Sequence, residues 1–410
     1  MTDTADTDPF AELLPGGLVL LEHWQAPEIS VQRTVKGAFR HWLEQFQGGG
    51  PEPGLDGPEE RDDLPALADE ALDRIAPPVE RAMAPARLGD ELRRALDQIR
   101  SVSHSALNTV AIVAPPFCGV APALAALADL EDEGWRVLPA PPHRRLTATE
   151  AHRWWSEQDL SGRWVIPELA HYWLRHPDGL ALVSALFERL ARAGAEPDGS
   201  EGLVGCSSWC WQFWTRYLPT GLPLHAFTPA PLDACRLGTW LQGLTLSAAH
   251  APLTLHHRRD TAPVLPRPSD AEFRPGGYLR ELAATARGNA GVALELWRHA
   301  LRAVPDAPES GQLAAQVASL DDLSLPAVPP DPSSSLGFVL HGLLQHDGLD
   351  PDDLAACTGL APVTVALSLD RLARARLVVG NADGVWRLTA LGYPAARRYL
   401  QGWGFPMDAF

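Results

Sequence analysis

The chain contains almost no lysine. Lys36, in the segment RTVKGAF, is the only lysine among 34 lysines and arginines. No site elsewhere in the sequence can therefore use a lysine ammonium group to hold a phosphate. The accompanying abundance of arginine, alanine, leucine and proline is typical of GC-rich bacterial coding sequences, and we infer no function from it.

Positive charge of any kind is scarce. The 34 basic residues are outnumbered by 51 aspartates and glutamates, which gives a formal net charge of -17. Nucleic acids and anionic membranes bind proteins through basic surfaces, so this charge excludes both as partners of the whole protein. Through Ile99 the sequence carries 20 acidic and 9 basic residues, which we interpret as a solvated helical surface rather than an acidic partner site.

Cysteine is sparse and follows no pairing pattern. The five cysteines are scattered, with no CxxC pair and no histidine cluster: Cys118, Cys206, Cys210, Cys235 and Cys357. Disulfide frameworks and zinc sites are recognised by closely spaced sets of such residues. We therefore expect reduced thiols that fill apolar space, no metal ion and a cytoplasmic location.

We also expect neither a targeting peptide nor a membrane-spanning segment. The N-terminus, MTDTADTDPF, is polar and acidic, unlike a signal peptide. Residues 105–128 carry no charge, and their number is sufficient for a membrane span. Pro115, Pro116 and Pro122 divide this segment into a strand-like and a helix-like half, so we expect no membrane contact.

Composition shifts and linkers divide the chain into seven segments. We expect a helical N-terminal region (1–50), a flexible linker (51–66), a helical lead-in (67–104), an α/β core (105–232), a mostly helical region (233–322), a Pro/Ser linker (323–335) and a compact C-terminal module (336–410). Val31, Val35 and Phe39 illustrate the helical spacing in the first segment. The sequence GGGPEPGLDGPEERDD marks the first linker.

Short apolar runs alternate with helical patterns through the core. This alternation is typical of an α/β domain, and it predicts a five-stranded, mostly parallel sheet. The expected strands are 109–114, 135–138, 163–166, 203–207 and 225–228, and the expected helices are 121–132, 149–158, 179–193 and 209–217. We expect no further strand between Asp233 and the C-terminal module.

The C-terminal module has the element order of a winged helix-turn-helix. Three helices (336–345, 350–357, 362–375) precede two strands (377–379, 385–388) and a last helix (390–402). Asp350 is placed to cap the second helix, and residues 381–384, NADG, supply the turn between the strands.

The segment TVAIVAPPFCGVAPALAAL, residues 109–127, has the outline of a phosphate-binding strand, loop and helix. In the pattern GxxxxGK[ST], backbone N–H groups cradle the phosphates, the lysine contacts them and the hydroxyl binds Mg²⁺. The corresponding residues here are Ala114 and Gly119 at the two glycines, Val120 at the lysine and Ala121 at the hydroxyl residue. Pro115 and Pro116 also remove two N–H donors, so the segment lacks the groups that hold a phosphate.

From residue 105 onward the sequence resembles the AAA+ and STAND-type P-loop ATPases, in the layout of ATPase core, helical lid and C-terminal winged helix found in origin-recognition-type initiators. The resemblance implies a P-loop NTPase-like core and makes residues 233–322 the lid. In such proteins a second motif supplies a Mg²⁺ ligand and a water-activating carboxylate. WVIPE, residues 164–168, is similar to it, with Pro167 at the metal-binding position and Glu168 at the catalytic one.

Two further motifs follow from the same resemblance. LVGCSSWCWQFW places Ser207 or Ser208 at the tip of the fourth strand, where the family senses the γ-phosphate. ATARGNAGVALELW, residues 284–297, resembles the lid motif in which a turn opens a helix, and it implies Arg287 or Arg298 as the nucleotide-facing arginine.

Each of these residues also has a simpler interpretation. Glu168 without a metal-binding partner is expected to be a surface or capping carboxylate. The serines do not form a hydrolase site, because GCSSW lacks the second glycine of GxSxG. Without the lysine, the hydroxyl and the aspartate, a transition state would lose its main charge partners, so we expect no ATP hydrolysis and no cofactor.

The C-terminal module offers few groups for reading DNA. Its third helix presents Thr364 and Ser368, and Arg371, Arg374 and Arg376 follow at its end. Residues 336–410 contain six arginines and seven aspartates, so DNA binding is expected to be weak and protein contact is favoured.

The sequence therefore predicts a catalytically inactive, ATPase-like regulatory or scaffold protein that acts through protein–protein contacts. The resemblance suggests an active ATPase of the same class as a partner. Two alternatives stay open: a winged-helix DNA-binding transcriptional regulator, and a protein that binds ATP without turnover because helix N-termini still favour anions.

Overall fold

The computed structural model describes residues 13–27, 64–102, 108–129, 134–193, 200–218, 221–249, 255–257, 263–266, 273–304, 315–331 and 333–410. The chain divides into two compact units. We call the first the helical unit; its described parts fall within residues 26–78 and 231–324. The second, the sheet unit, comprises residues 13–25, 79–230 and 325–410.

A six-stranded sheet forms the centre of the sheet unit. Its strands lie in the order β1-β6-β2-β5-β4-β3, and they are β1 (Leu18–Leu20), β2 (Thr109–Ala114), β3 (Arg136–Val137), β4 (Arg163–Ile166), β5 (Glu201–Ser207) and β6 (His225–Pro229). All neighbours are parallel except β1, which pairs antiparallel with β6. The run TVAIVA of β2 is almost wholly buried, as expected for a central strand of a parallel sheet.

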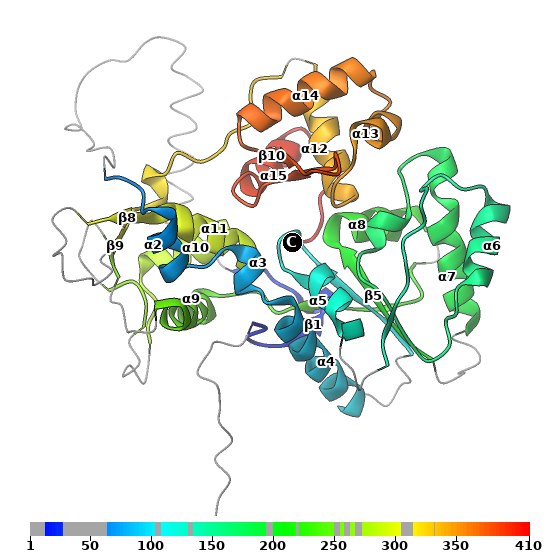
Figure 1. The fold of residues 1–410 in the computed structure, drawn as a ribbon, viewed down its shortest axis with the longest axis horizontal. Coiled ribbons are helices and arrows are strands. Elements are labelled where there is room, and N and C mark those ends of the chain that lie inside the picture. The colour runs from blue at the N-terminus through cyan, green and yellow to red at the C-terminus, as the bar shows by residue number, and fades with distance from the viewer. Residues whose placement is uncertain are drawn as a thin grey trace, which may run out of the picture. The chain divides into compact units, whose positions relative to one another are not determined.

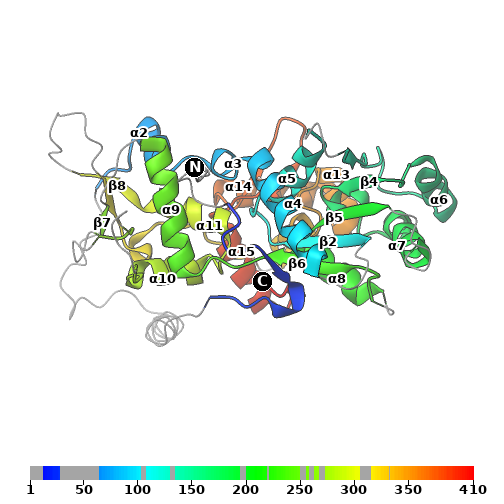
Figure 2. The same ribbon diagram turned by 90° about the horizontal axis from the view of Figure 1, so that it is seen from below.

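Helices cover both faces of this sheet. Leu88, Leu92 and Leu96 of α4 (Pro85–Val102) pack with α5 (Val120–Ala126) on one face. The opposite face buries side chains of α6 (Ala148–Glu157), α7 (Ala181–Ala193) and α8 (Ser208–Tyr217); Figure 2 shows the two layers. The chain thus leaves β2 toward one face and leaves its neighbour β5 toward the other.

The five core strands and four core helices lie where the sequence predicts them, with one exception at a helix end. The helix predicted at 121–132 ends as α5 at Ala126 and continues as a 3-10 turn over Leu127–Asp129, and residues 130–132 lie outside the described residues. The sheet has a sixth strand that we did not predict. Residues 18–20 were expected in a helical N-terminal region, which is wrong at this point, because Leu18, Val19 and Leu20 pair with β6 instead. Pairing satisfies the backbone groups of the exposed β6 edge. The helix predicted around 31–46 and most of the linker (51–63) lie outside the described residues.

The C-terminal module folds beside this sheet as part of the same unit. It contains α12 (Ser335–Gln345), α13 (Pro351–Thr358), α14 (Pro362–Arg374), β10 (Val378–Gly380), β11 (Trp386–Leu388) and α15 (Tyr393–Gly402). Figure 1 shows them gathered as a compact group, coloured orange to red. Asp350 accepts hydrogen bonds from the amides of Asp352 and Asp353, and β10 pairs antiparallel with β11. The predicted cap and the predicted two-stranded ribbon are therefore confirmed.

The helical unit contains α2 (Asp69–Ile75), α9 (Ala234–Ala249), α10 (Gly277–Thr285) and α11 (Ala290–Ala300). It also contains a three-stranded sheet of β7 (His256–His257), β9 (Ala315–Val317) and β8 (Leu301–Ala303). The prediction that no strand follows Asp233 before the C-terminal module is wrong, because strands of two or three residues are too short to carry a visible alternation.

The lead-in predicted as one helical segment is shared between the two units. The α2 helix belongs to the helical unit, where Thr245 Oγ1 donates to the carbonyl of Ile75 at 3.1 Å. The following helices, α3 (Val79–Ala82) and α4, belong to the sheet unit. Within the described part of the chain, no single helix combines the length and apolar composition of a membrane span, although α13 and α14, bent by 113°, pass this test as a pair.

Candidate functional site

The carboxyl edge of the parallel sheet is the natural place to look for a site. In open α/β sheets, ligands bind outside the carboxyl ends of the strands, at the point where the chain leaves two neighbouring strands toward opposite faces. Here that point lies between β2 and β5. Ala114 and Ser207, the last residues of these strands, are direct partners in the register, so the predicted loop and the predicted serines meet at this edge.

The loop between β2 and α5 connects a strand to a helix, as the sequence predicts, and it lacks side chains that could bind a phosphate. Residues 114–121, APPFCGVA, carry no charged side chain. Phe117 and Gly119 have φ angles of 72° and 71°, in the left-handed region that favours glycine. The conformation therefore costs energy at Phe117, and it places the phenyl ring 5.8 Å from the Tyr393 ring of α15, edge to face.

Glu168 holds two strands together at the carboxyl edge. Its Oε1 accepts hydrogen bonds from the amide of Ala170 and from the amide of Ser207, both at 2.9 Å. It is thus a capping carboxylate, as one interpretation of the sequence expected, and it is buried rather than at the surface. Burial, followed by the Asp347 carboxylate, raises the pKa of Glu168 to about 7.

Gly205 explains how this segment comes so close to β5. A Cβ atom at Gly205 would collide with the carbonyl oxygen of Pro167. Backbone cannot move aside as a flexible side chain can. The absence of a side chain at Gly205 therefore allows Pro167 and Glu168 to lie against β5.

Ser208 binds a carboxylate from the far end of the chain. Its Oγ donates to Asp408 Oδ2, and Arg397 of α15 donates to Asp408 Oδ1. The Trp209 indole N–H donates to the Tyr393 hydroxyl at 3.1 Å, and the Arg397 guanidinium lies 5.7 Å from the centre of the Trp209 ring. Although burial lowers the pKa of Arg397, the Asp408 carboxylate raises it above its usual value. We call Ser208, Arg397 and Asp408 the Asp408 network.

A second group of contacts joins α12 and α13 to the segment after β4. The amide of Arg175 donates to His346 Nε2 at 3.3 Å, and the Arg175 side chain donates to the carbonyl of Cys357 at 3.3 Å. The imidazole of His346 lies 4.3 Å from the Trp173 ring. Burial, with Arg144 and Arg175, holds the pKa of His346 well below its usual value, so the side chain is neutral. We call these the His346 contacts.

Ion pairs at the margin of the His346 contacts are more open to solvent. His171 Nε2 lies 3.6 Å from Asp347, and each side chain is one-third exposed. Arg144 Nε lies 4.0 Å from the Asp353 carboxylate. The carboxyl edge is therefore covered by groups of the same chain along β2, β5 and β4.

The two arginines predicted to face a nucleotide belong to the helical unit. Arg287 has a φ of 54° in the turn before α11. Arg298 donates to Asp73 at 3.1 Å and to the carbonyl of Ala76, so it connects α11 with the end of α2. These bonds give Arg298 a structural role within that unit.

The predicted DNA or partner contacts of the C-terminal module are only partly at the surface. Ser368 is buried, and its hydroxyl donates to Ser335 Oγ at 3.3 Å, which does not fit a surface contact. Arg371 donates to the carbonyl of Pro330 at 2.6 Å. Arg374 pairs with Asp370 at 2.7 Å. Thr364 is half-buried and Arg376 is exposed.

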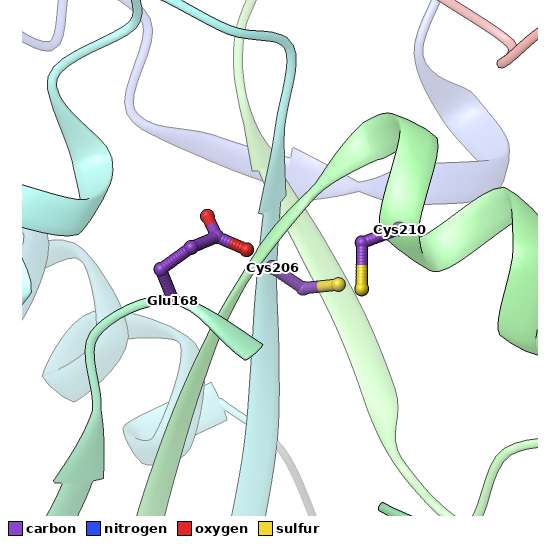
Figure 3. A group of neighbouring side chains, drawn as sticks. All are labelled: Glu168, Cys206 and Cys210. Atoms are coloured by element: carbon purple, nitrogen blue, oxygen red, sulfur yellow. The ribbon is translucent and has the colours of Figure 1, made fainter. Parts of the chain in front are cut away.

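One cluster was not predicted from the sequence. The Glu168 carboxyl group and the sulfur atoms of Cys206 and Cys210 lie within 4.8 Å of one another, and all three residues are buried. Figure 3 shows the two sulfurs beside each other, one at the end of β5 and one on α8. The signal was present in part: Cys206 lies at the end of a predicted strand, and Cys210 lies one turn into the helix that follows.

The contacts at the carboxyl edge connect parts of this chain to one another, and the loop at residues 114–121 has no cationic side chain of its own. Nothing along residues 114–121 can neutralise a phosphate by charge. No protein-family model matches the sequence, and no curated protein matches it.

Proposed function

We propose that this protein is a catalytically inactive relative of AAA+ and STAND-type ATPases, and that it acts as a regulator or scaffold through protein–protein contacts. The observation that carries the proposal is the cover on the carboxyl edge. Phe117 of the loop contacts Tyr393, and Ser208 binds Asp408. A nucleotide placed at this edge would have to displace a buried arginine–carboxylate pair and would find no cation in the loop.

The position of Glu168 supports the same proposal. In the family that the sequence resembles, the water-activating carboxylate works beside a Mg²⁺ ligand. Here Pro167 supplies no metal ligand beside Glu168, and the Glu168 carboxylate accepts hydrogen bonds from two backbone amides of the chain itself. Its geometry suits a structural role that connects the end of β4 with the end of β5.

The experiment is a nucleotide titration of the full chain. Phosphate release and thermal unfolding are measured with MgATP, and ATP without Mg²⁺ serves as the control. We expect no turnover and no change in the unfolding temperature at millimolar MgATP, because a ligand at 100 times its Kd would add about 2.7 kcal/mol. Turnover that disappears in Glu168→Gln would overturn the proposal. A shift without turnover would favour the alternative of an ATP-binding protein without hydrolysis.

The exposed surface of α14 favours proteins over DNA as partners of a winged helix. Val363 and Leu367 are 66% and 60% exposed and lie one turn apart near the start of this helix. DNA-reading helices present long polar or basic side chains at such positions. We expect fluorescence anisotropy with duplex DNA to show no slope of log K against log salt concentration; a negative slope would support the DNA-binding regulator instead.

The choice of partner rests on the resemblance. An active ATPase of the same class is the partner to test first, by size-exclusion chromatography of the two purified proteins together. Co-elution that is lost in Val363→Glu/Leu367→Glu, with unchanged thermal unfolding, would support a contact through α14.

A further inference from the structure

Glu168, Cys206 and Cys210 bring three potential metal ligands to one buried point. They come from three separate elements: Glu168 follows β4, Cys206 lies at the end of β5, and Cys210 lies in the first turn of α8 (Figure 3). Their ligand atoms are mutually within 4.8 Å. We propose that these three side chains form a binding site for Zn²⁺ or a similar thiol-binding divalent cation.

The distances are close to those that such an ion requires. Zinc binds sulfur at about 2.3 Å and carboxylate oxygen at about 2.0–2.2 Å, so ligand atoms around a tetrahedral ion lie roughly 3.5–3.8 Å apart. Ligand atoms that lie 4.8 Å apart therefore have to approach by roughly 1.0–1.3 Å. Two thiolates favour zinc over Mg²⁺ or Ca²⁺, which prefer oxygen ligands.

Hydrogen-bond donors contact two of the three ligands, Glu168 and Cys210. The Trp173 indole N–H donates to Cys210 Sγ at 3.2 Å, and two backbone amides donate to Glu168 Oε1. Donors of this kind orient metal ligands and favour their anionic forms. A carboxylate has about four acceptor positions, so these amides leave capacity for a cation.

The charge of the cluster also fits a bound cation. Glu168, Cys206 and Cys210 are three acidic groups that lie together in one buried site, so their ionised forms repel one another. A divalent cation reverses this effect by stabilising the anions. Binding would release one proton from each thiol, and one from Glu168 where it is protonated. Two thiolates, one carboxylate and Zn²⁺ then carry a net charge of -1.

The test measures metal content and ligand spectroscopy in the full chain, and it does not depend on the proposed function. Because the site is buried, the protein is loaded by refolding with Zn²⁺ or Co²⁺ under reducing conditions. We expect one zinc ion per chain, and a sulfur-to-cobalt charge-transfer band with Co²⁺. Cys206→Ser and Cys210→Ser should each reduce the intensity of the band and weaken binding by more than about 100-fold, beyond the range for outer-shell changes, and the double variant should abolish the band. Cys235→Ser, which removes an exposed thiol, is the matched control and should change neither.

Two further variants keep the proposal falsifiable if the serine variants do not fold. Trp173→Phe retains an aromatic ring, removes the donor to Cys210 and should weaken binding by about 10–100-fold. Glu168→Gln can retain the amide bonds, removes the anionic ligand and should change the cobalt spectrum. A wild-type chain that refolds without taking up zinc or cobalt overturns the proposal. A cobalt band that persists in Cys206→Ser/Cys210→Ser also overturns it, because the ion would then lie elsewhere.

Discussion

Two sets of contacts join the C-terminal module to the carboxyl edge of the sheet, and they differ in how deeply their charged groups are buried. The Asp408 network holds a full ion pair away from water: the Arg397 and Asp408 side chains are 11% and 1% exposed. The His346 contacts instead use a neutral imidazole in the interior and keep their ion pairs nearer the surface.

This difference should determine which perturbation weakens each set of contacts. Removing one member of a buried ion pair leaves the other charge without a partner, which is costly, whereas exposed pairs contribute little. The Asp408 network should therefore be sensitive to substitution and the His346 contacts to pH. Four predictions separate the two, in order of expected effect.

Asp408→Ala should lower the free energy of unfolding by about 3–5 kcal/mol, because Arg397 stays buried without its carboxylate. Urea unfolding of the full chain measures this. Asp370→Ala is the matched control: Asp370 pairs with Arg374 on the exposed surface of α14, and its loss should cost less than about 1 kcal/mol. Equal losses in the two variants would contradict the distinction between the buried ion pair of the Asp408 network and an exposed ion pair.

Acid should destabilise α12, the helix that directly precedes His346, through its buried His341, which packs against Trp209 and Phe405. Burial and then Arg175 lower the pKa of His341 to about 4 from 6.5. His341 is therefore harder to protonate in the folded protein than in the unfolded protein. The free energy of unfolding keeps its full value above pH 6.5 and decreases as the pH falls toward 4, by about 3 kcal/mol in total.

His341→Phe should remove this pH-dependent loss. The measurement compares the free energies of unfolding of both proteins at pH 7 and at pH 4.5. Any packing cost of phenylalanine between Trp209 and Phe405 is the same at both pH values and cancels in the difference. If the difference in free energy of unfolding between the two proteins is the same at pH 7 and at pH 4.5, His341 is not the source of the acid-induced loss.

Tyr393→Phe should cost about 1–3 kcal/mol, because it leaves the buried Trp209 indole N–H without its acceptor. A double-mutant cycle with Trp209→Phe isolates this bond. We expect the double variant to lose less than the sum of the single variants. Strict additivity would mean that the two groups do not interact.

Asp353→Asn should change stability by less than about 1 kcal/mol, since its contact with Arg144 is 4.0 Å long and partly exposed. Burial and the nearby Asp350 raise the pKa of Asp353, so its ionisation is less favourable there than in water. Thermal unfolding at low and high salt measures the effect. A loss of stability as large as that of Asp408→Ala would mean that the partly exposed ion pair contributes as much as the buried one.

The residues that the sequence placed correctly are those whose position follows from local pattern. The apolar runs 109–114 and 201–207 are strands because they are buried on both faces. The resemblance assigned the loop, Glu168 and Ser207 to one site, and the structure places them at the same edge of the sheet. The order of elements in the C-terminal module followed from helix caps and turn residues.

What the sequence did not reveal depends on contacts between distant residues. Asp408 binds Ser208 across 200 positions, and no periodicity or motif marks either residue for that bond. Glu168 meets Cys206 and Cys210 only because Gly205 lets neighbouring strands approach closely. The strands β1, β7, β8 and β9 are three residues or fewer, so pairing partners rather than local preference decide them.

The shortness of the outer strands has a consequence for self-association. The sheet ends in β1, with three residues, on one side and in β3, with two residues, on the other. An edge this short offers few backbone groups to a strand from another molecule. Deleting residues 1–24 would expose the five-residue β6 in its place, and that shortened chain should form dimers or aggregates through a continuous intermolecular sheet.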